Sequence, residues 1–150
     1  MTPKFLIRDV MESDFREWRD LYLGYLEFYK VEPKEENLRK TFDWILSDES
    51  IQQGFLVESE GQLVALAHFQ IQPNPLRAEQ RMYLNDLYIR PSFRGKGLVE
   101  LIIEALKNRC VECGISDLRW LTSHDNYRAR AAYDRHAKPI GFLTYQAAMK

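Results

Sequence analysis

The chain has 150 residues, of which 45% are hydrophobic, and this length suits one domain with a substantial core better than two. We therefore expect a single domain over residues 1–150. Lys and Arg number 21 against 22 Asp and Glu, so no overall basic field favours nucleic acid as a partner. No stretch approaches the ~20 apolar residues of a membrane span, and the first residues lack the pattern of a leader. We expect a cytoplasmic protein that binds neither nucleic acid nor membrane.

The first half of the chain predicts a strand, two helices and a hairpin. Ser13 is the expected N-cap of the first helix, and Pro33 stops that helix. In chain order, the elements are a strand over 5–10, helices over about 13–30 and 35–46, and strands over 51–58 and 62–71.

The second half alternates strands and helices. Asp125 is the expected cap of the last helix. The elements here are a strand over 82–89, a helix over 98–113, a strand over 117–122, a helix from about 126 and a closing strand over 142–149. The resulting order is β, α, α, β, β, β, α, β, α, β. This order predicts an α/β protein with a mixed, twisted sheet flanked by helices.

Two cysteines, Cys110 and Cys113, form a lone C-x-x-C late in the helix over 98–113. A zinc site would need a second pair, and a thioredoxin-like site would place the motif before a helix. We therefore predict reduced thiols and no metal.

The junction Arg90-Pro-Ser-Phe-Arg-Gly-Lys-Gly-Leu-Val joins a strand directly to a helix. The first amide N–H groups of a helix have no intrahelical partner, and the positive end of the helix dipole lies there. Gly95 and Gly97 allow a sharp turn and close approach of an oxygen-rich ligand. Arg90, Arg94 and Lys96 add cationic side chains suited to phosphate. The junction therefore predicts a pyrophosphate site, although its glycine spacing matches neither the dinucleotide fingerprint nor the Walker loop.

A second motif follows downstream: Asn126-Tyr-Arg-Ala-Arg-Ala-Ala-Tyr133, then Gly141-Phe142. Together, the run from Leu84 to Leu98 and this helix resemble motifs A and B of the GNAT acyltransferases, which transfer an acetyl group from acetyl-coenzyme A to an amine. Val99 stands where the family carries Gly or Ala. The longer link between Tyr133 and Gly141 resembles the histone and polyamine acetyltransferase branch.

The resemblance implies the GNAT fold, in which the strands over 82–89 and 117–122 splay apart to admit the pantetheine arm. It also implies a bulge in the first of these strands, and main-chain pairing of Leu87 and Ile89 with the pantetheine amides. Asn126 would contact the same arm. The implied acetyl-CoA contacts are Leu87, Tyr88, Ile89, Arg94, Gly95, Lys96, Gly97, Leu98, Val99, Asn126 and Tyr133.

Tyr133 is the implied acid that protonates the departing thiolate, since a phenol is neutral at pH 7. The base stays open among Asp86, His68, His124 and a water chain, because an amine with a pKa near 10.4 must lose a proton before attack. Strand alternation places Asn85 and Asp86 on opposite faces.

The acceptor pocket is expected at an aromatic stripe of the first helix, with Tyr22, Tyr25, Tyr29 and Asp86 as its contacts. The resemblance thus predicts N-acetylation of a primary amine, which is a small amine, polyamine, amino acid or lysine side chain. The alternative is a non-catalytic acyl-CoA sensor or interaction module of the same fold. A homodimer is a possible assembly, because dimers are common among relatives.

Overall fold

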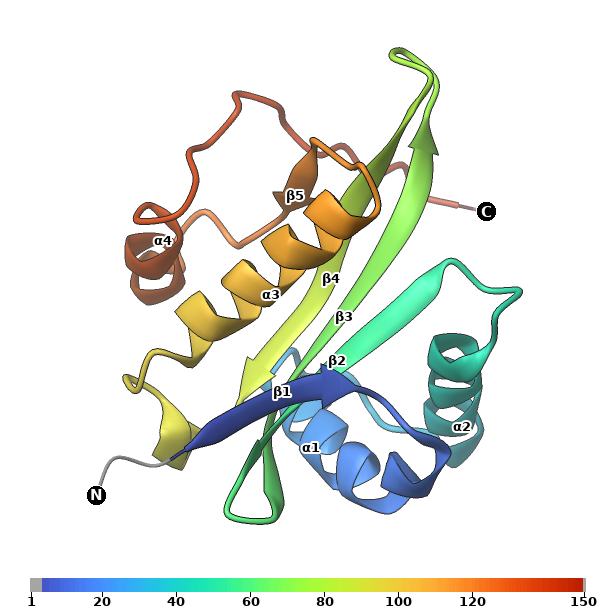
Figure 1. Cartoon of the computed structure of the whole chain (residues 1–150), viewed down its shortest axis with the longest axis vertical. Helices are drawn as coiled ribbons and strands as arrows, with labels where there is room; N and C mark the ends of the chain where they lie inside the picture. The colour runs from blue at the N-terminus through green and yellow to red at the C-terminus, as the bar shows by residue number, and fades with distance from the viewer. Residues whose placement is uncertain (1–3, 150) are drawn as a thin grey trace.

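A computed structural model describes residues 4–149, and its centre is one five-stranded sheet (Figure 1). The strands are β1 (Phe5–Asp9), β2 (Gln52–Ser59), β3 (Gln62–Asn74), β4 (Glu79–Ile89) and β5 (Leu118–Trp120). The helices are α1 (Phe15–Phe28), α2 (Glu35–Leu46), α3 (Leu98–Glu112) and α4 (Tyr127–Tyr133), with 3-10 turns η1 (Glu12–Asp14) and η2 (Pro91–Phe93). The strands lie in sequence order, antiparallel except for the parallel β4–β5 pair. The predicted mixed α/β sheet is thus confirmed.

Two apolar layers sandwich this sheet. On one face, α1 and α2 bury Trp18, Leu21 and Phe42 against β2 and β3. On the other face, α3 buries Ile102 and Leu106 against the opposite side chains of β2, β3 and β4. In Figure 1, α1 and α2 lie on the far side of the sheet from α3 and α4. No helix of the described residues is long and apolar enough to cross a membrane.

The parallel strands β4 and β5 separate after three residue pairs. Met82, Tyr83 and Leu84 pair with Leu118, Arg119 and Trp120, and β5 ends there while β4 continues to Ile89. The predicted splay of these two strands is therefore present. It leaves five residues of β4 with an unpaired edge, which is the kind of edge that accepts an added strand or a peptide-like ligand.

A β-bulge at Asn85 marks the start of this unpaired stretch. Opposite β3, Phe69 pairs with Leu84 and His68 pairs with Asp86, so Asn85 is the extra residue. The Asn85 side chain accepts hydrogen bonds from Gln52 and Gln70, and Asp86 meets His68. Gln70 and His68 lie two residues apart on β3, so both side chains of the Asn85-Asp86 pair reach one face. The prediction that they lie on opposite faces was wrong because the bulge interrupts the alternation.

Two caps and one element also differ from the expectations. Ser13 lies inside η1 rather than capping α1, and Asn126 replaces Asp125 as the cap of α4, its side chain accepting from the amide of Ala129 at 3.3 Å. The closing strand over 142–149 is absent, and these residues have no regular secondary structure. Its apolar side chains are exposed, with Phe142 at 77% and Tyr145 at 88%. The three-residue β5 presents too short an edge to hold a further strand.

Candidate active site

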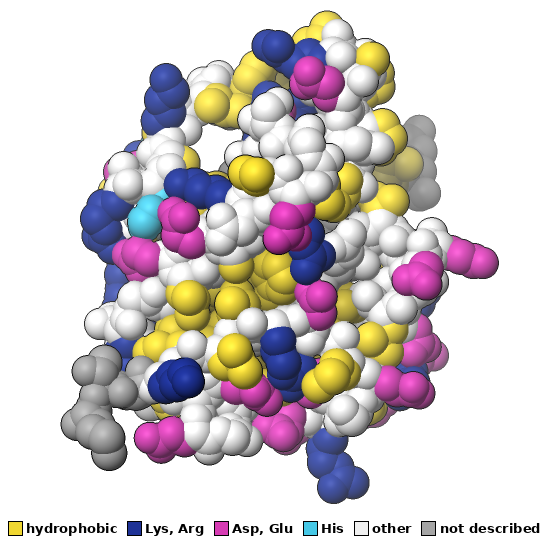
Figure 2. All heavy atoms as spheres, viewed as in Figure 1, with side chains coloured by type: hydrophobic (Ala, Val, Ile, Leu, Met, Phe, Trp, Pro, Cys, Tyr) yellow, Lys and Arg dark blue, Asp and Glu magenta, His cyan; other side chains and the backbone are white. Residues whose placement is uncertain are grey.

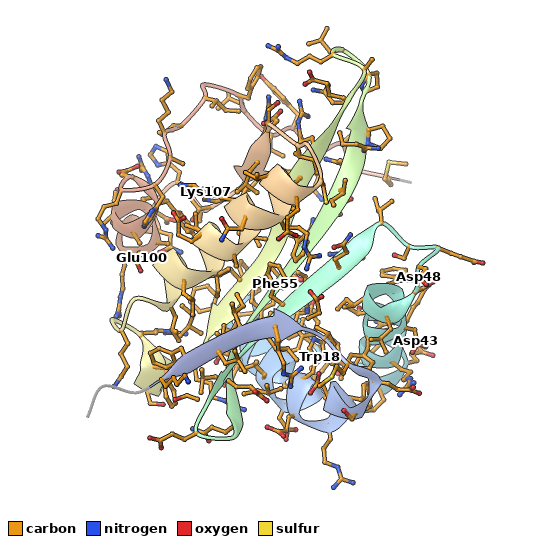
Figure 3. All side chains as sticks on the ribbon, viewed as in Figure 1. Trp18, Asp43, Asp48, Phe55, Glu100 and Lys107 are labelled. Atoms are coloured by element: carbon orange, nitrogen blue, oxygen red, sulfur yellow. The ribbon has the colours of Figure 1, made fainter. Side chains whose placement is uncertain are left out.

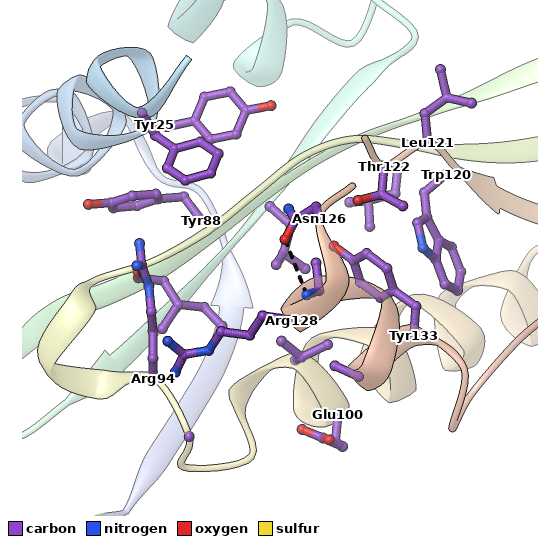
Figure 4. A pocket seen from close by; sticks show the side chains of 18 of the residues that line it. Tyr25, Tyr88, Arg94, Glu100, Trp120, Leu121, Thr122, Asn126, Arg128 and Tyr133 are labelled. Carbon is purple, nitrogen blue, oxygen red and sulfur yellow. Dashed lines mark hydrogen bonds between the residues drawn. The ribbon is translucent and has the colours of Figure 1, made fainter. Parts of the chain in front are cut away.

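A cavity of about 470 Å3 occupies the gap that β4 and β5 leave open. Its size is that of a small-molecule site. Its walls come from α1, β4, the loop before α3, the end of β5 and α4 (Figure 4). On the face viewed in Figure 1, apolar side chains are also exposed between α3 and β1 (Figure 2), and β1 contributes no residue to the cavity lining. The lining residues include Tyr25, Phe28, Tyr29, Leu87, Tyr88, Ile89, Arg94, Gly95, Gly97, Val99, Trp120, Asn126, Arg128 and Tyr133.

The loop before α3 forms one end of this cavity. Gly95 and Gly97 have φ of +75° and +81°, and the space beside each α-carbon is open. Among residues 4–149, no hydrogen bond is recorded from the amides of Gly95, Lys96 and Gly97. Glycine is the residue that adopts this conformation without strain. The loop therefore presents free amide donors beside the N-terminus of α3, as an anion requires.

Two arginines reinforce the positive charge of this end. The Arg94 Nε donates to the carbonyl of Ile89 at 3.1 Å, which fixes the side chain and leaves its outer nitrogens free to bind an anion. Arg128 extends from α4 toward the same region in Figure 4. Neither guanidinium has an ion-pair partner among the described residues, whereas Arg135 pairs with Glu100 at 2.7 Å. Both cations are thus available to phosphate oxygens.

The backbone of β4 faces the middle of the cavity. The amide of Arg90 donates to the carbonyl of Val64 in β3, so alternation turns the main-chain groups of Leu87 and Ile89 away from β3 toward the unpaired edge. An extended ligand that carries amides can pair with them as an additional strand does. The main-chain groups of Leu87 and Ile89 thus face the cavity.

Tyr133 lies on α4 across the cavity from β4. Its ring packs edge-on against Trp120 with centroids 5.4 Å apart. Its hydroxyl has no hydrogen-bond partner among residues 4–149, and burial, with a smaller effect of Tyr29, raises the pKa of this phenol. The group therefore stays protonated at neutral pH and is free to donate into the cavity.

Comparison with known proteins decides the family. A model of the acetyltransferase (GNAT) family matches residues 14–137. This chain is a GNAT acetyltransferase. It therefore uses acetyl-CoA as its acyl donor, and the non-catalytic alternative loses support.

Individual relatives agree with this assignment. The yeast Saccharomyces cerevisiae has a D-amino-acid N-acetyltransferase, HPA3, that is 26% identical over 97% of this chain and 92% of its own. The crystal structure of ribosomal-protein-alanine N-acetyltransferase from Brucella melitensis biovar Abortus 2308 has a TM-score of 0.83 at 20% identity, covering 98% of this chain and all of that chain. The structure of AAC(6')-Iy with a bisubstrate analogue of CoA has a TM-score of 0.81 at 16% identity, covering 98% of this chain and 99% of that chain. These relatives do not single out the histone and polyamine branch.

The residues present fit acetyl-CoA. The open glycine turn, the unpaired loop amides and the two available arginines suit its pyrophosphate, and the β4 edge suits the amides of its pantetheine arm. Val99 packs partly against the α3 core and also lines the cavity, so its side chain does not close the site. Leu98 is buried in that core, and Lys96 and Leu98 do not line the cavity.

On the other side of β4, the GNAT site borders a partly buried polar network. The Asp86 carboxylate accepts from Tyr25 Oη at 2.8 Å on Oδ1, and from Tyr22 Oη at 3.2 Å and His68 Nδ1 at 2.8 Å on Oδ2. His68 in turn accepts from Trp18 Nε1 at 3.0 Å. Of these residues only Tyr25 lines the cavity.

The charge states in this network follow from the contacts. Burial opposes ionisation of Asp86, but hydrogen bonds from His68, Tyr25 and Tyr22 outweigh it and hold its pKa below the usual range. Burial and the Asp86 charge raise the pKa of both tyrosines. At neutral pH Asp86 is therefore an anion and both phenols are protonated.

Sequence reasoning missed several supporting residues. Gly24 faces Tyr88, and a Cβ there would overlap the Tyr88 hydroxyl, so glycine lets α1 approach β4. Trp120 lines the cavity outside the quoted motifs, and Arg128 lies within the second motif but was not among the expected acetyl-CoA contacts. His124 does not line it; its carbonyl accepts from Arg130. The glycine within the aromatic stripe was the available signal for the close helix–strand contact.

Proposed function

We propose that this GNAT enzyme acetylates a primary amine of a small molecule or a lysine side chain by direct attack on acetyl-CoA. The single observation that carries the acceptor class is the end of the cavity beside α1. There Tyr25, Phe28 and Tyr29 offer aromatic surfaces, and the Asp86 anion lies directly behind the Tyr25 hydroxyl. Aromatic faces and a nearby carboxylate favour a cationic amine.

Each step has a candidate residue. Acetyl-CoA supplies the acetyl group as a thioester. Arg94, Arg128 and the loop amides would hold its pyrophosphate, and the Leu87 amide, on the open edge of β4, would donate to the thioester carbonyl oxygen. Tyr133 would give its proton to the leaving sulfur. From a phenol at its ordinary pKa near 10 to a thiol near 8.5, this transfer costs about 2 kcal/mol, and the raised pKa of Tyr133 adds to that cost.

Loss of the amine proton is better assigned to water than to Asp86. Removing a proton from an amine of pKa 10.4 into solvent at pH 7 costs about 4.6 kcal/mol by any route. A carboxylate whose pKa is lowered accepts a proton poorly, and Asp86 lies behind Tyr25 rather than in the cavity wall. Both observations favour a water chain as the base.

A thiol reagent that detects released CoA tests this function. The purified protein is given acetyl-CoA with polyamines, L- and D-amino acids, lysine peptides and simple alkylamines; the D-amino acids are included because HPA3 is named for them. We expect amine-dependent CoA release for at least one class, with mass spectrometry showing an added acetyl group on nitrogen. No release with any class would contradict the proposal.

A further inference from the structure

One line of hydrogen bonds connects the core beneath α1 to the wall of the cavity. It begins at Trp18, which is fully buried, passes through His68 at 1% exposure, and reaches Asp86 and then Tyr25. The contacts join α1 to β3, β3 to β4 and β4 back to α1. Every polar atom along the line has a partner.

The direction of each hydrogen bond is fixed by chemistry. The indole Nε1–H of Trp18 can only donate, so His68 Nε2 must accept and carries no proton. His68 is therefore neutral with its proton on Nδ1, which donates to Asp86. The titratable groups recorded against His68 are Asp86 from β4 and Tyr22 from α1. His68 has no free nitrogen left to act as a base.

Asp86 takes part in this line as an acceptor only. Its Oδ1 accepts the hydrogen bond of the Tyr25 hydroxyl, which therefore cannot donate elsewhere. The two lone pairs of the Tyr25 oxygen remain for the cavity, which Tyr25 lines. Tyr25 therefore presents only a hydrogen-bond acceptor to the cavity, and the negative charge of Asp86 lies behind it.

We propose that Tyr25 is the residue that docks the acceptor, with its oxygen accepting a hydrogen bond from the amine nitrogen, and that Asp86, His68 and Trp18 are positioning residues that fix this polarity. The inference rests on the proposed function and deepens it. It makes the site selective for nitrogen that carries hydrogen, as ammonium or amine, over groups that only accept.

Substitution of Asp86 by Asn reverses the polarity. Oδ2 of Asp86 faces two donors, His68 and Tyr22, whereas Oδ1 faces only Tyr25. The oxygen of the substituted carboxamide would therefore take the side of the two donors, and its NH2 would donate to Tyr25. The Tyr25 proton would then point into the cavity and oppose the N–H of the acceptor.

Steady-state kinetics with the best amine of the panel test this inference on four proteins: wild type, Tyr25→Phe, Asp86→Asn and Tyr22→Phe. Tyr22→Phe is the matched control, because it also removes one hydroxyl from Asp86 but lies outside the cavity. We expect KM for the amine to rise about 10-fold or more in Tyr25→Phe and in Asp86→Asn, the size of one hydrogen bond to a charged group. The KM for acetyl-CoA should change less than about 3-fold in both.

The comparison with the control decides the outcome. If Tyr22→Phe raises the amine KM as much as Tyr25→Phe does, the increase comes from the loss of a hydrogen bond to Asp86 and not from a lost contact with the amine. The docking role of Tyr25 is then wrong. An unchanged amine KM in Asp86→Asn, with its thermal melting showing a folded protein, overturns the polarity argument. If Asp86→Asn is unfolded, the ratio of Tyr25→Phe to Tyr22→Phe still decides the docking role. A wild-type enzyme inactive on every amine instead removes the proposed function itself.

Discussion

Replacing Tyr133 with Phe separates the chemical role of this phenol from its packing role. The ring and its edge-on contact with Trp120 at 5.4 Å remain, and no recorded partner loses a hydrogen bond. The free energy of unfolding should therefore change by no more than about 0.5 kcal/mol. A general acid contributes about 10²- to 10⁴-fold to the rate of a proton-transfer step, so kcat should fall by about that factor.

The assay combines CoA release with binding of CoA by calorimetry. Binding should stay within about 3-fold of wild type, because the proposed pyrophosphate contacts come from the loop before α3 and from Arg128 of α4. Tyr127→Phe is the matched control: it lies on the same helix, is 70% exposed and does not line the cavity. Its kcat should equal that of wild type.

The pH dependence of kcat is an independent test of the acid role of Tyr133. Burial raises the Tyr133 pKa above its usual value near 10, so the acid form persists through neutral pH and is lost only as pH rises through the raised pKa. The alkaline decrease in kcat that this group causes should be absent from Tyr133→Phe. A variant that keeps wild-type kcat across the pH range would refute the acid role.

Three further results are expected. Arg94→Ala should weaken CoA binding about 10-fold or more and make that binding less sensitive to salt, because the Arg94 guanidinium is held by the Ile89 carbonyl and has no carboxylate partner among the described residues. Arg77→Ala, on the β3–β4 turn, is the control and should bind CoA as wild type does. Equal salt dependence of CoA binding in the two variants would contradict the phosphate role of Arg94. Gly97→Ala and Gly114→Ala should each cost about 1 kcal/mol of stability, since both glycines have positive φ with open space around them, but only Gly97→Ala should also weaken CoA binding in calorimetry. Because the pKa of Asp86 is lowered in the folded protein, the contribution of this carboxylate to stability is complete above about pH 4 and is lost as pH falls through its folded-state pKa. The melting temperature of Asp86→Asn should therefore fall less steeply with decreasing pH in that acid range than the melting temperature of wild type.

The local patterns of the sequence predicted the elements whose signals are contiguous. The glycine turn before α3 and the helix that carries Tyr133 were predicted from short contiguous runs, and both line the same cavity. Helix α2 has the predicted bounds because its amphipathic repeat and the preceding Pro33 define it locally. Where an element depends only on neighbours along the chain, the sequence alone was sufficient to predict it.

Features that depend on distant contacts could not be predicted in this way. The line from Trp18 to Tyr25 joins residues that lie 18 to 61 positions apart at its links. The bulge at Asn85 shows only in the register against β3, and it brings the side chains of Asn85 and Asp86 to one face where opposite faces were expected. The closing strand expected over 142–149 needed a neighbouring edge to pair with, and the three-residue β5 is too short to supply one.

The bulge at Asn85 also sets the phase of the rest of β4. Leu84 pairs with Phe69 and Asp86 pairs with His68, so the bulge absorbs Asn85 and the register against β3 is regular on both sides of it. A strand that paired Asn85 with His68 in place of the bulge would shift every later residue of β4 by one position and turn it over. Asp86 would then leave His68, and the amides of Leu87 and Ile89 would turn toward β3 instead of the gap. Loss of the bulge with Asn85 retained is thus the change that would separate the carboxylate behind Tyr25 from the open-edge amides of β4.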